Sequence, residues 1–277
     1  MIPSRLYIPA ILLVAATAVA AEPETAMRAL QLETGYSQMY NLEFDAAHRT
    51  FSQWQRVHPD DPLGPVSNAA AYLFAEFDRL HILQSEFFVH DSNFTRARKL
   101  SPDPAVRQAF DRELAESEQL ENRILAQSPA DKNALFAMLL NRGLRADYEA
   151  LIEKRNLASL RDIKDGRAVA EKLLAIDPAY YDAYLAIGVE NYMLSLKPAP
   201  VRWFLQMAGA QTDAARGIEK LRLTAEKGQL LRPYARLLLA VAALRDKDLT
   251  QARGILQELS REFPRNRLYA EELARLR

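Results

Sequence analysis

The stretch that decides the fold is residues 44–59, which read FDAAHRTFSQWQRVHP. The stretch ends in a proline. A large apolar residue lies fifteen positions before this proline, a small residue lies twelve positions before it, and another large apolar residue lies five positions before it. Steps of three and seven residues keep these side chains on one face of a helix. The proline ends the helix, because it has no backbone N–H to donate within it. The stretch therefore predicts a helix that packs closely against a neighbour.

The same pattern recurs before three more prolines. The four prolines are Pro59, Pro129, Pro178 and Pro264. Fifteen residues before them, in the same order, are the large apolar residues Phe44, Leu114, Ile163 and Leu249. Twelve before are the small residues Ala47, Ser117, Gly166 and Ala252. Five before are the large apolar residues Trp54, Ile124, Leu173 and Leu259. A recurrence of this kind predicts one packing unit that is used four times.

The remaining sequence predicts an all-α fold. It has only 9 glycines in 277 residues, and its long runs are rich in Ala, Leu, Glu, Arg and Gln without an apolar-polar alternation. We expect a single domain over 22–277, with helices over 25–39, 44–57, 66–88, 104–127, 132–154, 157–176, 180–196, 212–227 and 267–276. The last of these would cap the open end of a repeat array.

The first pair resembles the tetratricopeptide repeat (TPR). Gly35, Phe44, Ala47, Phe51 and Pro59 fall at places 8, 17, 20, 24 and 32 of a 34-residue unit, and residues 239–264 match in the same way. The resemblance implies a right-handed superhelix of about five antiparallel helix pairs, over 25–59, 66–128, 132–177, 180–228 and 233–264, with a cap over 267–276. The central pairs depart from the repeat length. Another helical-hairpin solenoid or a compact helical bundle stays an alternative.

Residues 1–20 have the pattern of a secretory signal peptide. Arg5 precedes an apolar run over 8–20, which ends in the small-x-small pattern Ala18-Val19-Ala20. We expect cleavage after Ala20 or Ala21; an uncleaved anchor or a buried helix is the alternative. The chain has no cysteine and so no disulfide. Export to a bacterial periplasm is the localisation we expect.

Charge argues against nucleic-acid binding. Lys plus Arg and Asp plus Glu both total 36, so the formal net charge is zero. Beyond the first twenty residues, no stretch approaches the length that a transmembrane helix needs.

The sequence offers weak candidates for metal binding and catalysis. His48, His58, His81 and His90 are not spaced for one metal site, and Asp60-Asp61 predicts a helix cap more strongly than a calcium site. Glu76, Asp78 and Glu86 could form a carboxylate pair, but surface charges are the simpler interpretation. No nucleophile motif, phosphate-binding loop or dinucleotide fingerprint occurs in the chain. We therefore expect no catalysis, no cofactor and no bound metal.

Aromatic residues are the best candidates for binding. From the resemblance, we expect the first helix of each pair to contact a partner in the concave groove, with Tyr36, Tyr40, Tyr72 and Tyr184 as candidates. Residues 197–209, KPAPVRWFLQMAG, carry Trp203 and Phe204 and predict either a short helix tucked on the core or a lid or docking element.

The function we expect is a non-catalytic scaffold that binds a protein or peptide of unknown identity. A periplasmic protein that encloses a small or lipidic ligand between long helices is the alternative. A helical hydrolase is a weaker one.

Overall fold

The computed structural model describes residues 21–83 and 100–276, with side chains from residue 31 onward. Within these residues the chain forms twelve α-helices, one π-helical turn and one 3-10 turn, and no strand. The predicted all-α fold class is confirmed. The predicted signal segment, residues 1–20, lies outside the described part of the chain.

The bounds of the helices follow the order of the chain. They are α1 (Ala21–Tyr40), α2 (Phe44–Val57), α3 (Leu63–Arg79), α6 (Pro104–Gln127), α7 (Lys132–Asp147), α8 (Asn156–Ile176), α9 (Tyr184–Ser195), α10 (Ala199–Met207), α11 (Ala214–Lys227), α12 (Arg232–Arg245), α13 (Leu249–Glu262) and α14 (Arg267–Arg275). The π-helical turn, Tyr148–Glu153, extends α7, and the 3-10 turn, Tyr181–Ala183, precedes α9. None of the described helices is both long and apolar enough to cross a membrane.

Local signals set many of the helix ends. The helices predicted over 44–57 and 104–127 match α2 and α6 at both ends. Asp103 caps α6, because its carboxylate accepts hydrogen bonds from the backbone N–H groups of the helix's first turn. Asp131, Asp213, Asp248 and Asn266 cap α7, α11, α13 and α14 in the same way.

Two predicted helices differ from the prediction toward their C-terminal ends. The helix expected over 66–88 stops at Arg79, and His81 then takes a left-handed conformation with φ 58°. The helix expected over 132–154 changes to π-helical geometry at Tyr148 and ends at Lys154, which has φ 59°. Periodicity alone did not predict these breaks, because apolar residues continue beyond both of them.

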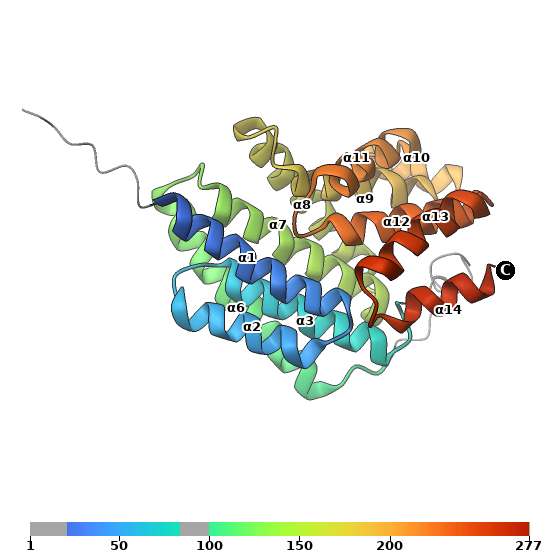
Figure 1. The fold of residues 1–277 in the computed structure, drawn as a ribbon. Coiled ribbons are helices and arrows are strands. Elements are labelled where there is room, and N and C mark those ends of the chain that lie inside the picture. Colours follow the sequence, from blue (N-terminus) through green and yellow to red (C-terminus); the bar gives the residue numbers. More distant parts are fainter. Residues whose placement is uncertain (1–20, 84–99, 277) are drawn as a thin grey trace, which may run out of the picture.

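Consecutive helices pack against one another along the chain (Figure 1). α1 packs on α2, α2 on α3, and the series continues through α6, α7, α8, α9, α11, α12, α13 and α14. α10 stands apart from this series, in the connection between α9 and α11.

The small residues of the repeated pattern lie inside the fold. Ala47, Ser117, Gly166 and Ala252 are all buried. At Gly35 an added Cβ would come within 2.3 Å of the Phe51 ring, so the helices of this pair touch there. Leu249 differs from the prediction. It begins α13, at the end of the helix's apolar stripe, and is 47% exposed.

The C-terminal end of the chain folds back on the N-terminal helices. The side-chain amide of Asn266 donates to the Tyr40 carbonyl at 2.8 Å, and the ring of Phe263 lies against that of Tyr40 with centroids 5.5 Å apart. Arg267 donates to both carboxylate oxygens of Asp78, at 2.7 and 3.0 Å. The series of helices therefore closes on itself and encloses a central space.

Candidate functional site: a central cavity

A cavity of about 120 Å³ lies inside the closed series of helices. Its walls come from α1, α3, α7, α8, α9 and α12, together with Asp182 of the 3-10 turn and Leu231, so residues far apart in the sequence meet there. Most of the lining side chains are apolar: Met39, Ala70, Phe74, Leu139, Leu140, Leu144, Ile163, Leu185, Ala186 and Val189. The cavity thus offers mainly apolar contacts to whatever enters it.

Four aromatic rings form one side of the cavity. Tyr36 and Tyr40 of α1 lie with ring centroids 6.3 Å apart, and Phe74 meets both Tyr40 and Tyr234 edge to face, at 6.3 and 5.7 Å. The Tyr40 hydroxyl donates to the Leu230 carbonyl at 3.0 Å. Burial raises the pKa of Tyr36, Tyr40 and Tyr234, so their hydroxyl groups stay protonated.

Asp147 places a carboxyl group among these apolar and aromatic side chains. It is the last residue of α7 and lies deep in the fold, yet part of its surface stays accessible because it borders the cavity. Desolvation raises its pKa to about 7, and a hydrogen bond with Tyr234 opposes this rise. No ion pair with Asp147 occurs within 21–83 and 100–276.

Two further carboxylates that line the cavity already have partners. Asp182 accepts backbone N–H hydrogen bonds from residues 229–231, at the start of α12, at distances of 3.0 to 3.2 Å. Asp162 forms an ion pair with Arg142 at 3.2 Å. Asp147 is therefore the carboxyl group of the cavity that a bound ligand could use as a charge partner.

A larger hollow of about 650 Å³ shares Asp182 with the central cavity. Its lining is mixed: aliphatic residues and prolines lie beside the acidic residues Glu33, Asp60, Asp61 and Asp131 and the rings of Trp54, His58, Phe136 and Tyr180. Asp60 pairs with Arg123, which does not line the hollow, at 2.6 Å. No lysine or arginine is found among the described residues that line either space. The two together form a locally negative region on a chain of zero net charge.

The structure brings two of the predicted binding tyrosines together and separates the others. Tyr36 and Tyr40 line the central cavity. Tyr72 faces His48, with ring centroids 4.0 Å apart, and Tyr184 donates its hydroxyl to the Pro178 carbonyl. Neither Tyr72 nor Tyr184 is among the residues that line the cavity. The face of the helix on which each ring lies decides this difference.

The segment over 197–209 forms the short helix α10. Trp203 and Phe204 are 64% and 66% exposed, and neither lines the cavity. Only Leu205 of α10 is buried, in a small cluster with Leu194 and Ala210. The segment is thus a short helix, as one interpretation predicted, but most of its apolar surface faces outward.

The histidines in the described part of the chain have structural partners. His48 Nδ1 lies 2.6 Å from the Asn68 side-chain oxygen, and the His58 ring lies against Trp54 with centroids 4.2 Å apart. No group of three or more possible metal ligands occurs within the described ranges. His90 lies outside them.

The acidic candidates act mainly as caps and ion-pair partners. Asp61 accepts hydrogen bonds from the Leu63 N–H and the Asn133 side chain, at 2.9 and 2.8 Å. The interpretation of Glu76 as a surface charge is wrong, because it is 2% exposed and binds Arg79 through both carboxylate oxygens. Glu86, its possible partner in acid-base work, lies outside the described residues.

Sequence reasoning did not single out Asp147 and Tyr234. One signal was present, because Asp147 follows Leu140 and Leu144 at helical spacings of seven and three. A charged residue on an apolar helical stripe is costly to bury unless it has a partner or a function. That Tyr234 lies beside it could not be seen, since 87 positions separate the two residues in the sequence.

Comparison with models of known protein families, with curated proteins and with solved structures found no match to this chain. The site must therefore be interpreted from its own geometry and chemistry.

Proposed function

We propose that this protein is a binding protein that holds a small organic cation, an amine with an apolar body, in the central cavity. The observation that carries the proposal is the Asp147 carboxyl group, which borders an aromatic and apolar cavity without a cationic partner among the described residues. A buried carboxylate is stabilised by an opposite charge within a few ångströms. Aromatic ring faces attract the same kind of ligand.

We further propose that the fold is a TPR-like right-handed superhelix of about five helix pairs with a C-terminal capping helix. The sequential packing of the helices and the buried column of small residues support this. The cavity walls include α1, α3, α7, α9 and α12, the first helices of successive pairs, which line the concave face in such an architecture.

The cavity favours a small ligand over a peptide partner. An α-helix with its side chains is about 10 Å across, whereas a cavity near 150 Å³ holds a molecule about the size of benzene. The contacts of Tyr40 with Leu230, Phe263 and Asn266 close the space that a peptide in the concave groove would need. The expected protein scaffold is therefore less well supported than its small-ligand alternative.

The acidic hollow beside the cavity supports a cationic ligand. It lies next to Asp182 and has no lysine or arginine among its described lining residues. A concave surface with charge of one sign raises the local concentration of oppositely charged ligands. Export to the periplasm, proposed from residues 1–20 alone, would give the protein access to amines outside the cytoplasm.

Binding of a matched set of probes tests the proposal. Isothermal titration calorimetry would compare isobutylamine with isobutyl alcohol and isobutyrate, which are about the size of benzene and have the same number of carbon atoms but differ in charge. We expect binding in the order amine, alcohol, isobutyrate, with about a tenfold difference at each step, equivalent to about 1.4 kcal/mol. The affinity for isobutylamine should increase as the pH is raised through 7, because Asp147 must lose its proton to pair with the ammonium group.

Two variants locate the site. Asp147→Asn should remove the preference for the amine over the alcohol. Glu121→Gln is the matched control, because burial also raises the pKa of Glu121 to about 7, while Glu121 does not line the cavity. No heat from any probe would overturn the small-ligand proposal. Equal affinity for the amine and the alcohol would overturn only the proposal that the ligand is a cation.

A further inference from the structure

Helix α10 presents an apolar face to solvent. Four of its nine residues are large, hydrophobic and exposed: Val201 is 44% exposed, Trp203 64%, Phe204 66% and Met207 69%. Single exposed hydrophobic residues are common on protein surfaces, but a contiguous group marks an interaction site. Four other large hydrophobic residues are exposed in the described part of the chain, and they are spread over α2, α8 and α13.

The four side chains form one continuous stripe. Val201, Phe204 and Met207 follow one another at steps of three, and Trp203 precedes Met207 by four, so all lie on adjoining parts of one helical face. Leu205, four residues after Val201, lies at the edge of this face and is the one buried residue of α10, in a cluster with Leu194 and Ala210. A surface helix of a globular protein normally has the reverse arrangement, with its wide apolar face toward the core.

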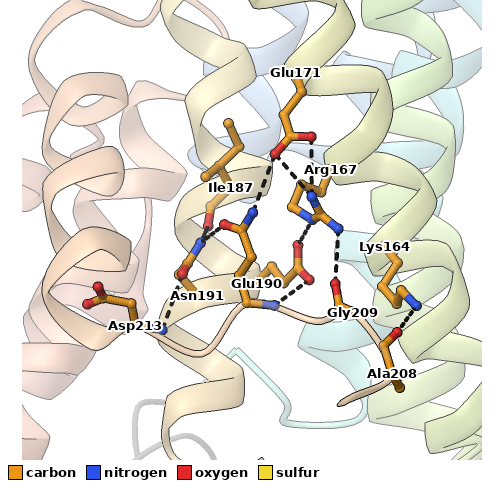
Figure 2. Close-up of polar contacts among 10 residues, drawn as sticks. Lys164, Arg167, Glu171, Ile187, Glu190, Asn191, Ala208, Gly209 and Asp213 are labelled. Atoms are coloured by element: carbon orange, nitrogen blue, oxygen red, sulfur yellow. Dashed lines mark hydrogen bonds and ion pairs between the residues drawn. The ribbon is translucent and has the colours of Figure 1, made fainter. Parts of the chain in front are cut away.

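A network of polar contacts fixes the chain directly after α10 (Figure 2). Lys164 donates to the Ala208 carbonyl, and Arg167 donates to the Gly209 carbonyl at 3.2 Å. Glu190, which is fully buried, pairs with Arg167 at 2.6 Å and accepts from the Gln211 N–H at 3.0 Å. The exposed stripe is thus held on a defined support, and a partner would not have to order it on binding.

The charge around the stripe is positive. Residues 196–212 contain Lys197 and Arg202 and no acidic residue. Lys164 contributes a third cation at the end of α10 through its contact with Ala208. Of the carboxylates in the network, Glu171 and Glu190 are paired with Arg167, and Asp213 caps α11 by accepting from the Arg216 N–H. An apolar stripe with basic residues near its ends is complementary to an anionic lipid surface.

The size of the stripe argues against a stable protein dimer. With 150 to 250 Å² for each aromatic side chain, four partly exposed side chains present roughly 400 Å². A stable protein interface needs about 800 Å² from each partner. A few inserted apolar side chains together with basic residues are sufficient for reversible attachment to a membrane surface.

We propose that α10 attaches this protein reversibly to anionic membranes. Val201, Trp203, Phe204 and Met207 would enter the boundary between headgroups and acyl chains. Lys197 and Lys164, near the two ends of α10, would stay at the level of the lipid phosphates, while Arg202 donates to the Ser195 and Lys197 carbonyls on the other side of the helix. This inference does not depend on the ligand proposed for the cavity.

Vesicle flotation tests this proposal. The purified full chain would be mixed with vesicles of phosphatidylglycerol and phosphatidylcholine in equal parts, or of phosphatidylcholine alone. We expect flotation with the first and at least about tenfold weaker binding to the second, and a further decrease as salt is raised. Tryptophan fluorescence gives a second readout, because Trp54 is 2% exposed and only the exposed Trp203 can move into lipid and shift its emission to the blue.

Matched variants connect the binding to α10. The double variant Trp203→Ser/Phe204→Ser should lose most of the flotation and keep its folded circular dichroism spectrum, because both side chains are exposed. Leu157→Ser, on α8, is the control, since Leu157 is 83% exposed and lies outside the stripe. Absence of flotation, or equal flotation of the double variant, would overturn the proposal. So would a wild-type dimer that the double variant abolishes, because a second copy would then cover the stripe.

Discussion

The helix pairs α1–α2 and α9–α11 both pack closely, but their helices are connected in different ways. Three residues connect α1 to α2, whereas residues 196–213 connect α9 to α11 and contain α10. In both pairs glycine allows the helices to approach closely: Gly35 meets Phe51, and Gly217 meets Tyr192. The close contact between the two helices is thus common to both pairs, whereas the connection between them can contain an additional helix with its own exposed surface.

The contacts at these two glycines differ in what would have to move. A Cβ added at Gly35 would meet the ring of Phe51, which is a side chain. A Cβ added at Gly217 would meet the backbone nitrogen of Tyr192 at 2.6 Å and its Cα at 2.9 Å. A ring can turn, but a backbone in a packed helix cannot move without shifting the whole helix.

The largest expected effect therefore comes from Gly217→Ala. We expect it to lower the free energy of unfolding by about 3 kcal/mol, and Gly35→Ala to lower it by about 2 kcal/mol. Chemical denaturation monitored by circular dichroism would measure both values. Gly254→Ala is the control, because nothing lies within 4 Å of its added Cβ, and it should be neutral or slightly stabilising. A larger loss of unfolding free energy in Gly35→Ala than in Gly217→Ala would contradict the expectation that the side-chain contact adapts more easily than the backbone contact.

The next effect concerns the support of α10 in the interrupted pair. Glu190→Gln should cost about 2 kcal/mol, because it weakens a charge-assisted contact to Arg167 inside the protein. Hydrogen exchange should increase at residues 208–213 and stay unchanged in α1 and α2. Glu171→Gln, a partly exposed partner of the same arginine, is the control and should change little. Uniform acceleration over the chain would show that the network stabilises the whole fold and not the connection.

We expect Asp147 to have a smaller effect on stability, and this effect should depend on pH. Its native pKa of about 7 lies above the value near 4 of an unfolded chain, so the native state binds more protons between these values and loses stability as the pH rises from about 4 to 7. Tyr234 of α12, Tyr36 and Tyr40 of α1, and Asp162 of α8 line the cavity with it.

Asp147→Asn should remove this dependence. Relative to wild type, the variant should gain on the order of 1 to 2 kcal/mol between pH 6 and pH 8. Thermal unfolding across this pH range would measure it. A constant difference between variant and wild type would show that Asp147 keeps the same charge in the native and unfolded states.

The smallest effect is expected where the chain closes on itself. Arg267→Ala removes the ion pair with Asp78, in which Arg267 is 53% exposed, and should cost less than about 1 kcal/mol. Asn266→Ala removes a buried hydrogen bond to Tyr40 and the cap of α14, and should cost more. Equal losses in the two variants, measured by denaturation, would mean that the ion pair is as important to the closure as the buried contact.

Much of the helical framework could be predicted because its signals are local. The start of α6 follows from its cap Asp103, and the bounds of α2 follow from its apolar face and the proline after it. The buried small residues Ala47, Ser117 and Ala252 follow from their regular distance to a proline. The site was harder to predict. Tyr36 and Tyr40, two of the predicted binding residues, line the cavity, while Asp147 and Tyr234 were not among the predicted residues.

By itself, the sequence determined that this protein is all-α and which residues begin, end and closely pack many of its helices. These properties depend on neighbours within a few residues, where spacing fixes the geometry. Only the tertiary structure decided that the chain closes on itself, that Asp147 lies within an aromatic cavity, and that α10 turns Trp203 and Phe204 outward. The physical reason is that burial depends on helices far away in the sequence, and the period of a single helix does not specify which of its apolar residues they cover.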